Sequence, residues 1–196
     1  MNSREQILSR VRQNQPAPVA LPDVPSFDRD LPSPADAFTA ALARMGGTVI
    51  HAAAGADLDA LIRERHAGAK LICSATPEVE GNLPIAGVRS ARDLADVDVG
   101  VVRAAFGVAE TGSVWLSEAQ FQLNALGFLS QHLVVLLDPA AIVPNLHHAY
   151  RQRGFFEARY AVLMTGPSAT ADIEGVLVRG AQGIRSLTVI LAPRPL

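Results

Sequence analysis

The segment Leu133-Val134-Val135-Leu136-Leu137, followed at once by Asp138-Pro139, decides the fold. Five successive apolar residues predict a strand that is buried on both faces, as in a parallel sheet covered by layers on both sides. Further short apolar runs are spaced along the chain, with helical patterns between most of them: Thr48–Ile50, Lys70–Cys73, Val97–Val102, Ala161–Met164 and Leu187–Leu191. Strands that alternate with helices predict an α/β fold with a mostly parallel central sheet.

The N-terminal part of the chain has a different pattern. Residues 2–13 predict a short amphipathic helix, with capping-box spacing at Ser3 and Gln6 and an apolar stripe at Ile7, Leu8 and Val11. Prolines recur through residues 14–34, so this stretch is expected to be an extended arm. We therefore divide the chain into a helix and arm, residues 1–33, and one α/β domain, residues 34–196. The first helix is either a docking element or a terminus packed on its own domain.

The next helix is expected to begin at Pro34, with Ser33 as its cap. A helix or two should follow Pro139 and reach about Arg153. Val108 and residues 113–116 predict a hairpin-like excursion around Glu110, which argues for some antiparallel pairing.

A second segment rich in hydroxyl groups follows the run that ends at Met164. The turn Thr165-Gly166-Pro167-Ser168 ends a strand. Thr170 then predicts a helix cap, with Asp172 and Glu174 in the first turn, where the helix dipole favours carboxylates. The alternative is a turn with a purely structural role.

Composition limits the classes of function. The 196 residues are 49% hydrophobic and 18% charged, with a net charge of −2, which is typical of a globular domain. There is no basic stripe that would favour nucleic acid, and the apolar runs are too short to span a membrane. We expect a cytoplasmic protein, because the N-terminus lacks the apolar core of a secretory signal.

Redox and metal chemistry find little support in the sequence. The single cysteine, Cys73, cannot form a disulfide within the chain or hold an iron–sulfur cluster by itself, and we expect it to be buried. His147 and His148 are adjacent and would point apart on a helix. Without a dinucleotide fingerprint or a phosphate-binding loop motif, the sequence predicts no cofactor and no metal site.

Candidate site residues follow the ends of the predicted strands, where open α/β sheets bind ligands. Arg103 could hold a carboxylate or phosphate, or form a structural pair with Glu110 or Asp172. The Thr165–Ser168 turn could hold an anion through backbone N–H groups, although Asp172 and Glu174 would then need a cation. The predicted site is one crevice with Glu110 and nine ligand-binding residues: Arg103, Thr111, Gly112, Thr165, Gly166, Ser168, Thr170, Asp172 and Glu174.

Two elements together resemble one protein family. Ala109-Glu110-Thr111-Gly112 and the segment Thr165–Glu174 are similar to the lactate-utilisation protein C family (LutC/YkgG), also called the LUD domain. The resemblance implies a three-layer α/β/α fold of the NagB/RpiA/CoA-transferase-like group. Related folds in that group use a glutamate as nucleophile in acyl-CoA transfer, which makes Glu110 a candidate catalytic residue by analogy.

The resemblance also implies a function and partners. The chain would be a component of a system that oxidises L-lactate to pyruvate, acting with iron–sulfur partner proteins and having no redox centre of its own. It would serve assembly, substrate or product handling, or the electron-carrying partners. A stand-alone enzyme acting on a CoA ester, phosphosugar or folate-like substrate is the alternative, and a sensor of a small ligand is the third. The sequence does not decide whether the chain binds a small carboxylate or other anionic ligand, or whether it forms a homo-oligomer.

Overall fold

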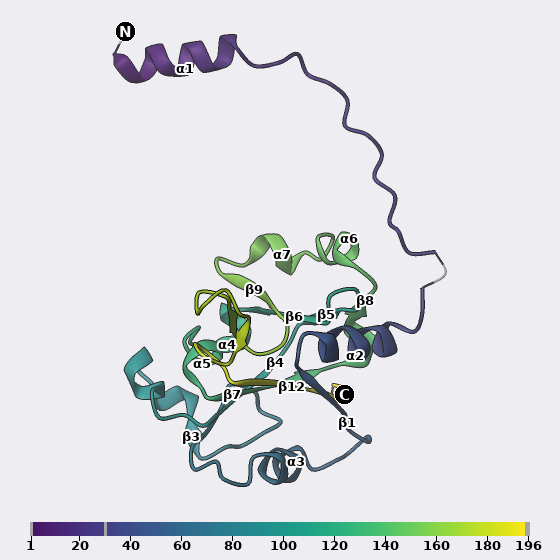
Figure 1. Cartoon of the computed structure of the whole chain (residues 1–196), viewed down its shortest axis with the longest axis vertical. Coiled ribbons are helices and arrows are strands. Elements are labelled where there is room, and N and C mark those ends of the chain that lie inside the picture. The colour runs from purple at the N-terminus through teal and green to yellow at the C-terminus, as the bar shows by residue number, and fades with distance from the viewer. Residues whose placement is uncertain (1, 30, 195–196) are drawn as a thin grey trace.

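A six-stranded parallel sheet forms the centre of the molecule (Figure 1). The computed structural model describes residues 2–29 and 31–194. The strands lie in the order β1, β12, β7, β4, β2, β3, and every neighbouring pair is parallel. Their bounds are β1 Thr48–His51, β2 Ile72–Ser74, β3 Leu83–Pro84, β4 Val99–Arg103, β7 His132–Leu137 and β12 Ser186–Leu191. The predicted α/β class and the mostly parallel central sheet are confirmed.

Strand β7 lies inside the sheet, and its side chains alternate between two cores. Leu133, Val135 and Leu137 belong to the larger core, on one face of the sheet. Val134 and Leu136 belong to the smaller core, on the other face. Side chains of a strand point alternately to opposite faces, so an all-apolar strand requires a covering layer on each side.

Helices α2 and α3 cover opposite faces of this sheet (Figure 1). Helix α2 (Pro34–Arg44) buries Phe38 and Leu42 completely and contacts β1, β5 and β8. It begins at Pro34 as expected, but the side chain of Ser33 makes no capping bond. Helix α3 (Leu58–Arg65) buries Ile62, and the N–H of Ala60 donates to the Asp57 carboxylate.

A smaller mixed sheet packs beyond the larger core. Its order is β8, β5, β6, β9, with β5–β6 and β6–β9 antiparallel and β5–β8 parallel. The bounds are β5 Phe106–Val108, β6 Ser113–Ser117, β8 Ile142–Val143 and β9 Ala161–Met164. The predicted hairpin around Glu110 is therefore correct. The run Ala161–Met164 forms a strand as expected, but that strand pairs in the smaller sheet and not in the central one.

The remaining helices are short. Their bounds are α4 Glu118–Phe121, α5 Leu126–Leu129, α6 Leu146–Ala149 and α7 Gly154–Glu157, with 3₁₀ turns at Ile85–Gly87, Ala91–Leu94 and Pro139–Ala141. The helix or two expected between Pro139 and about Arg153 correspond to the 3₁₀ turn Pro139–Ala141 and to α6, with β8 between them. Pro144 cannot donate to a helical ladder, and Asn145 starts α6 afresh by accepting from the His148 N–H.

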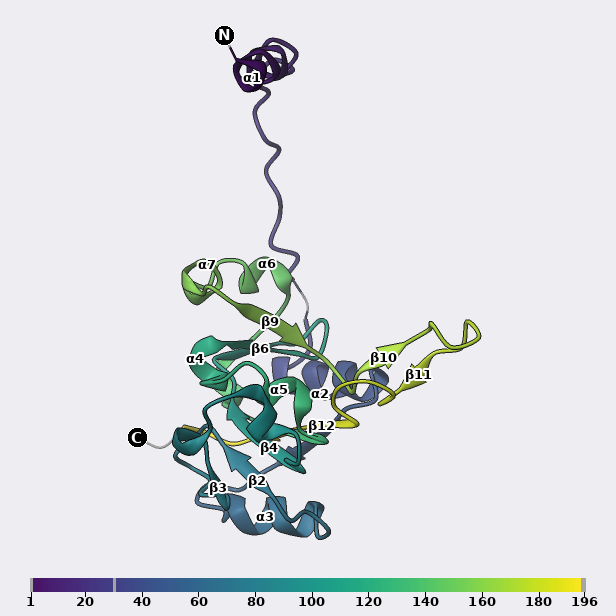
Figure 2. The same ribbon diagram turned by 90° about the vertical axis from the view of Figure 1, so that its left-hand side faces the viewer.

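The helix predicted after Thr170 does not form. Strands β10 (Ala169–Thr170) and β11 (Val178–Arg179) make a two-stranded hairpin that projects from the body (Figure 2). The Thr170 hydroxyl accepts from the Asp172 N–H at 3.2 Å, a local turn rather than a helix cap. Glu174 and Gly175 have φ of 54° and 70°, and this left-handed backbone is incompatible with an α-helix.

The N-terminal helix α1 (Ser3–Gln13) has no buried residue and lies at the end of an extended arm (Figure 1). Its capping box is formed by Asn2 and Glu5, one residue before the predicted Ser3 and Gln6. The Glu5 N–H donates to the Asn2 side chain, and the Asn2 N–H donates to the Glu5 carboxylate, both at 3.0 Å.

Two half-buried histidines meet beside the central sheet. The rings of His66 and His132 have centroids 4.8 Å apart, and His132 Nδ1 lies 2.7 Å from the Ser186 hydroxyl. Burial, reinforced by nearby positive charge, lowers the pKa of both histidines. Because the folded pKa lies below the unfolded value, the unfolded chain binds more protons as the solution becomes acidic.

We predict that the free energy of unfolding is largest above the unfolded histidine pKa and falls as pH is lowered from 7.5 to 5.5. Replacing both residues, H66Q with H132Q, should flatten this dependence, as measured by urea denaturation across the range. The exposed His51 is the matched control, and H51Q should keep the wild-type slope. A slope that survives in the double variant would contradict the assignment.

Candidate functional site

The carboxyl ends of the parallel strands meet at one edge of the central sheet. His51, Ser74 and Arg103 end β1, β2 and β4, while Asp138 and Ala192 follow β7 and β12. This is the edge at which open α/β sheets bind ligands. His51, Ser74, Arg103 and Asp138 therefore lie along this one edge, whereas Thr165–Ser168 follow β9 of the smaller sheet.

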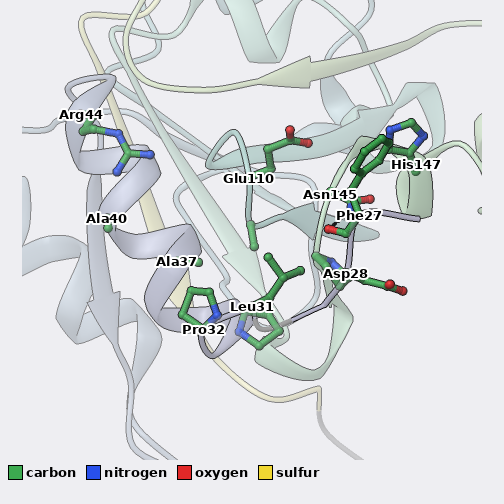
Figure 3. Close-up of a pocket in the computed structure, with 13 residues that line it drawn as sticks. Phe27, Asp28, Leu31, Pro32, Ala37, Ala40, Arg44, Glu110, Asn145 and His147 are labelled. Carbon is green, nitrogen blue, oxygen red and sulfur yellow. Dashed lines mark hydrogen bonds between the residues drawn. The ribbon is translucent and has the colours of Figure 1, made fainter. Parts of the chain in front are cut away.

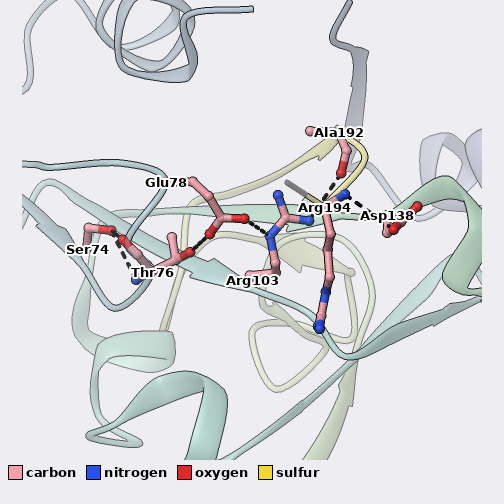
Figure 4. A network of polar contacts seen from close by, with 7 residues as sticks. All are labelled: Ser74, Thr76, Glu78, Arg103, Asp138, Ala192 and Arg194. Carbon is pink, nitrogen blue, oxygen red and sulfur yellow. Dashed lines mark hydrogen bonds and ion pairs between the residues drawn. The ribbon is translucent and has the colours of Figure 1, made fainter. Parts of the chain in front are cut away.

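Arg103 is the centre of a polar network at this edge (Figure 4). Its side chain is only 10% exposed, and Nε forms an ion pair with Glu78, whose side chain is 13% exposed. Arg103 Nη1 donates to the carbonyl of Ala192 at 3.1 Å, which links β4 to the end of β12. Glu78 also accepts from the Thr76 hydroxyl. The predicted alternatives, Arg103 paired with Glu110 or Asp172, are replaced by the pair with Glu78.

One terminal nitrogen of this guanidinium has no partner. Arg103 Nη2 is buried and makes no hydrogen bond in the described part of the chain. A guanidinium has five N–H donors. Nη1 donates to Ala192, while Nε forms an ion pair with Glu78 but no well-aligned hydrogen bond. Leaving a buried charged donor unpaired is costly, so an acceptor that reached this nitrogen would be stabilised there.

Two surface cavities meet at Arg103. The first, of about 530 Å³, is bounded by residues 53–59, which include the first two residues of α3, and by Pro193. The second, of about 430 Å³, is bounded by residues 75–77, Ala119 and Gln120. Glu78, Arg103 and Arg194 line both cavities. A ligand in either cavity would therefore lie beside the buried arginine.

Thr76 and Glu78 are functional candidates that the sequence prediction missed. They follow β2 in Ser74-Ala75-Thr76-Pro77-Glu78, where Ser74 and Thr76 form a local turn with bonds of 2.9 and 3.2 Å. Hydroxyls and a carboxylate directly after a buried strand are the same signal that singled out Thr165–Glu174. That signal was available at Ser74.

Glu110 lies in a different pocket, of about 620 Å³ (Figure 3). Its exposed carboxylate accepts from the Leu146 N–H at 3.1 Å, at the start of α6. The pocket lies between α2, the arm and the loop before α6, and Arg44 borders it as well. Glu110 thus caps the N-terminus of α6 and lines a pocket that does not include Arg103.

The glycines of the two family-like segments are packing positions against α2. Gly112 has φ of 63°, and a Cβ there would collide with the backbone of Leu42. Gly166 has φ of 66°, and a Cβ there would collide with the carbonyl of Met45. The Thr165 hydroxyl donates to the carbonyl of Thr111 at 3.2 Å, so the two segments touch. Their contact joins β6 and β9 to the end of α2.

The other predicted residues are spread over the hairpin. The Ser168 N–H donates to Ile184 and its carbonyl accepts from Gly180, which closes the base of β10 and β11. Thr165, Gly166 and Ser168 line a fourth depression, of about 310 Å³. Asp172 and Glu174 are exposed on the projecting turn. The residues predicted for one crevice thus face several separate surfaces, because β9 ends in the smaller sheet.

Cys73 is buried, as predicted, and burial raises the pKa of its thiol to about 11. Within residues 2–29 and 31–194, no group of three or more acidic, histidine or cysteine side chains is arranged to hold a metal ion. No helix in that same part of the chain is long and apolar enough to cross a membrane.

The fold and this edge define an α/β protein with a buried arginine at the carboxyl end of a parallel sheet. Residues 79–192 match the model of the LUD domain, and the chain belongs to that family. The match includes Arg103 and both glycine-containing segments.

Two curated proteins are similar to about half of this chain. The chain is 30% identical over 106 residues to uncharacterized protein YkgG of Escherichia coli strain K12, which covers 51% of this chain and 46% of that protein. It is 32% identical over 103 residues to uncharacterized protein NMB1437 of Neisseria meningitidis serogroup B, covering 51% and 44%. The chain thus spans about half the length of the curated relatives it matches.

A solved structure shares the fold. A DUF162 family protein from Deinococcus radiodurans superposes with a TM-score of 0.62 at 18% sequence identity. The superposition covers 81% of this chain and 96% of that chain.

We predict that G112A lowers the free energy of unfolding by about 3 kcal/mol, because a left-handed backbone and a collision with α2 add together. Gly55 is the matched control, since its φ is 76° and a Cβ there meets open space. G55A should lower stability by only about 1 kcal/mol. Urea denaturation of both variants measures the difference, and equal losses would show that packing against α2 is not the constraint.

Proposed function

We propose that this protein acts in L-lactate utilisation, as a component of the system that oxidises lactate to pyruvate. Membership of the LUD domain family supports the pathway. Iron–sulfur partner proteins would carry the electrons. The single cysteine of this chain is buried with a raised pKa, whereas clusters of that kind commonly use four thiolates. The oxidation would therefore take place with the partners' redox centres.

The observation that carries a ligand-handling role is the unpartnered Nη2 of Arg103. Two N–H donors of one guanidinium can hold a carboxylate, and such charge-assisted bonds are about twice as strong as neutral ones. The ion pair with Glu78 fixes the guanidinium in place. The Glu78 carboxylate also offers a hydrogen-bond acceptor beside Arg103. A 2-hydroxyl group can donate to that acceptor and a 2-oxo group cannot, so the site favours lactate over pyruvate.

The proposed site consists of Arg103, Glu78 and Thr76, with Arg194 at the cavity wall. Glu110 lines another pocket, so its role as an acyl-transfer nucleophile remains a separate prediction. The predicted ligand contacts of residues 165–174 likewise concern other surfaces. The proposal for lactate rests on the Arg103 cavities alone.

We predict that the purified full chain binds L-lactate and that R103K weakens binding about tenfold, equivalent to about 1.4 kcal/mol. Lysine keeps the positive charge beside Glu78 but cannot hold a carboxylate with two N–H groups. Isothermal titration calorimetry gives the affinities, and thermal melting checks that the fold is retained. R44K, on exposed α2 surface outside these cavities, is the control.

Failure of the wild-type chain to bind L-lactate would remove the ligand-handling role while leaving the pathway role open. If R103K binds L-lactate with unchanged affinity, Arg103 does not hold the carboxylate of the ligand.

The pathway role has its own test. We expect deletion of the gene to prevent growth on L-lactate as sole carbon source while leaving growth on pyruvate intact, because only the oxidation step is lost. Reintroduced wild-type protein should restore growth. When it carries an affinity tag, it should co-purify with proteins that show iron–sulfur absorption. Normal growth of the deletion strain on lactate would contradict the proposal.

A further inference from the structure

Helix α1 is too short to be stable alone. It has 11 residues and no buried side chain, and isolated helices of this length are marginal in water. Two residues of its apolar stripe are uncovered, with Ile7 61% exposed and Val11 53% exposed, while Leu8 is half-buried. Most helix stability in proteins comes from packing an apolar face, so α1 requires a surface to pack against.

The arm that carries α1 is held to the body at one point. The buried Asn145 side chain donates to the carbonyls of Ser26 and Phe27 at 2.7 and 3.3 Å. Asp28 pairs with His148 at 3.2 Å, and the ring of Phe27 lies 5.2 Å from that of His147. The arm therefore leaves the body at a defined place, beside α6.

Beyond that anchor the arm is stiff. Residues 14–25 contain Pro16, Pro18, Pro22 and Pro25, and no regular element forms there. Twelve residues of polyproline geometry extend roughly 37 Å. Figure 1 shows α1 standing well away from the domain. The arm thus holds α1 at a distance from the surface beside its own anchor.

A largely apolar pocket lies at the anchor itself. The pocket of about 620 Å³ in Figure 3 is lined largely by apolar side chains of the arm and of α2, among them Leu31, Ala37 and Ala40. Its acidic groups are Asp28 and Glu110, and its basic residues are Arg44 and His147. With the histidine neutral, the lining has a net charge of −1. Helix α1 carries Arg4, Arg10 and Arg12 against Glu5, so the charges of helix and pocket are opposite.

We propose that α1 of one copy packs its Ile7–Leu8–Val11 stripe into this pocket of a second copy, and that the exchange is reciprocal and makes a dimer. The second copy is favoured over the same chain because the stiff arm starts at the wall of its own pocket. Exchange of an identical element between two copies is a common route to a symmetric dimer. This inference is independent of the lactate role.

The test is the oligomeric state of the full chain, measured by light scattering after gel filtration. We expect a dimer, and we expect I7D to convert it to a monomer. Q6D adds the same charge on the opposite side of α1 and should stay dimeric. Neither change can unfold the domain, because α1 buries nothing within it.

The variant A40R tests the role of the pocket rather than that of α1. Ala40 is exposed and lines the pocket, so an arginine there would fill it and repel the arginines of α1. A43R is the matched control, since Ala43 is exposed on the same helix outside the lining. A40R should be monomeric and A43R dimeric. A monomeric wild-type chain, or a dimer unaffected by I7D or by A40R, would overturn the proposal.

Discussion

The pairing of β7 with a parallel strand on each side is the constraint on which the rest of the structure depends. Its apolar side chains enter both cores, so neither face of the central sheet can meet water. One face is closed by α3 and the other by α2 together with the smaller sheet. Parallel pairing also places every carboxyl end at one edge, the edge where open α/β sheets bind ligands and where Arg103 and its two cavities lie.

Arg103 shows how the fold positions the proposed ligand site. The end of β4 brings its guanidinium to the sheet edge, Glu78 and the carbonyl of Ala192 hold it there, and one nitrogen is left without a partner. A buried cation held by one carboxylate and one carbonyl still has donors to offer, which suits a small carboxylate. The proposed lactate role follows from this chemistry together with family membership.

The segments that most resemble the family have a structural role in this fold. Gly112 and Gly166 let the smaller sheet approach the backbone of α2 more closely than any side chain would permit. Thr165 links the two segments through the carbonyl of Thr111. Their hydroxyls and carboxylates were expected to converge, but Asp172 and Glu174 lie on a projecting hairpin with left-handed backbone at Glu174.

The sequence by itself determined the elements whose signal is local. Apolar runs located five of the six strands of the central sheet but not the two-residue β3. A lone apolar-flanked cysteine predicted a buried thiol, and the strand ends placed Arg103 at the carboxyl edge of the sheet. Tertiary structure alone decided which sheet receives Ala161–Met164, that Glu78 is the partner of Arg103, and that Glu110 faces a separate pocket. These outcomes depend on pairing between residues far apart in the chain, and local patterns of hydrophobicity and turn residues carry no information about which partners meet.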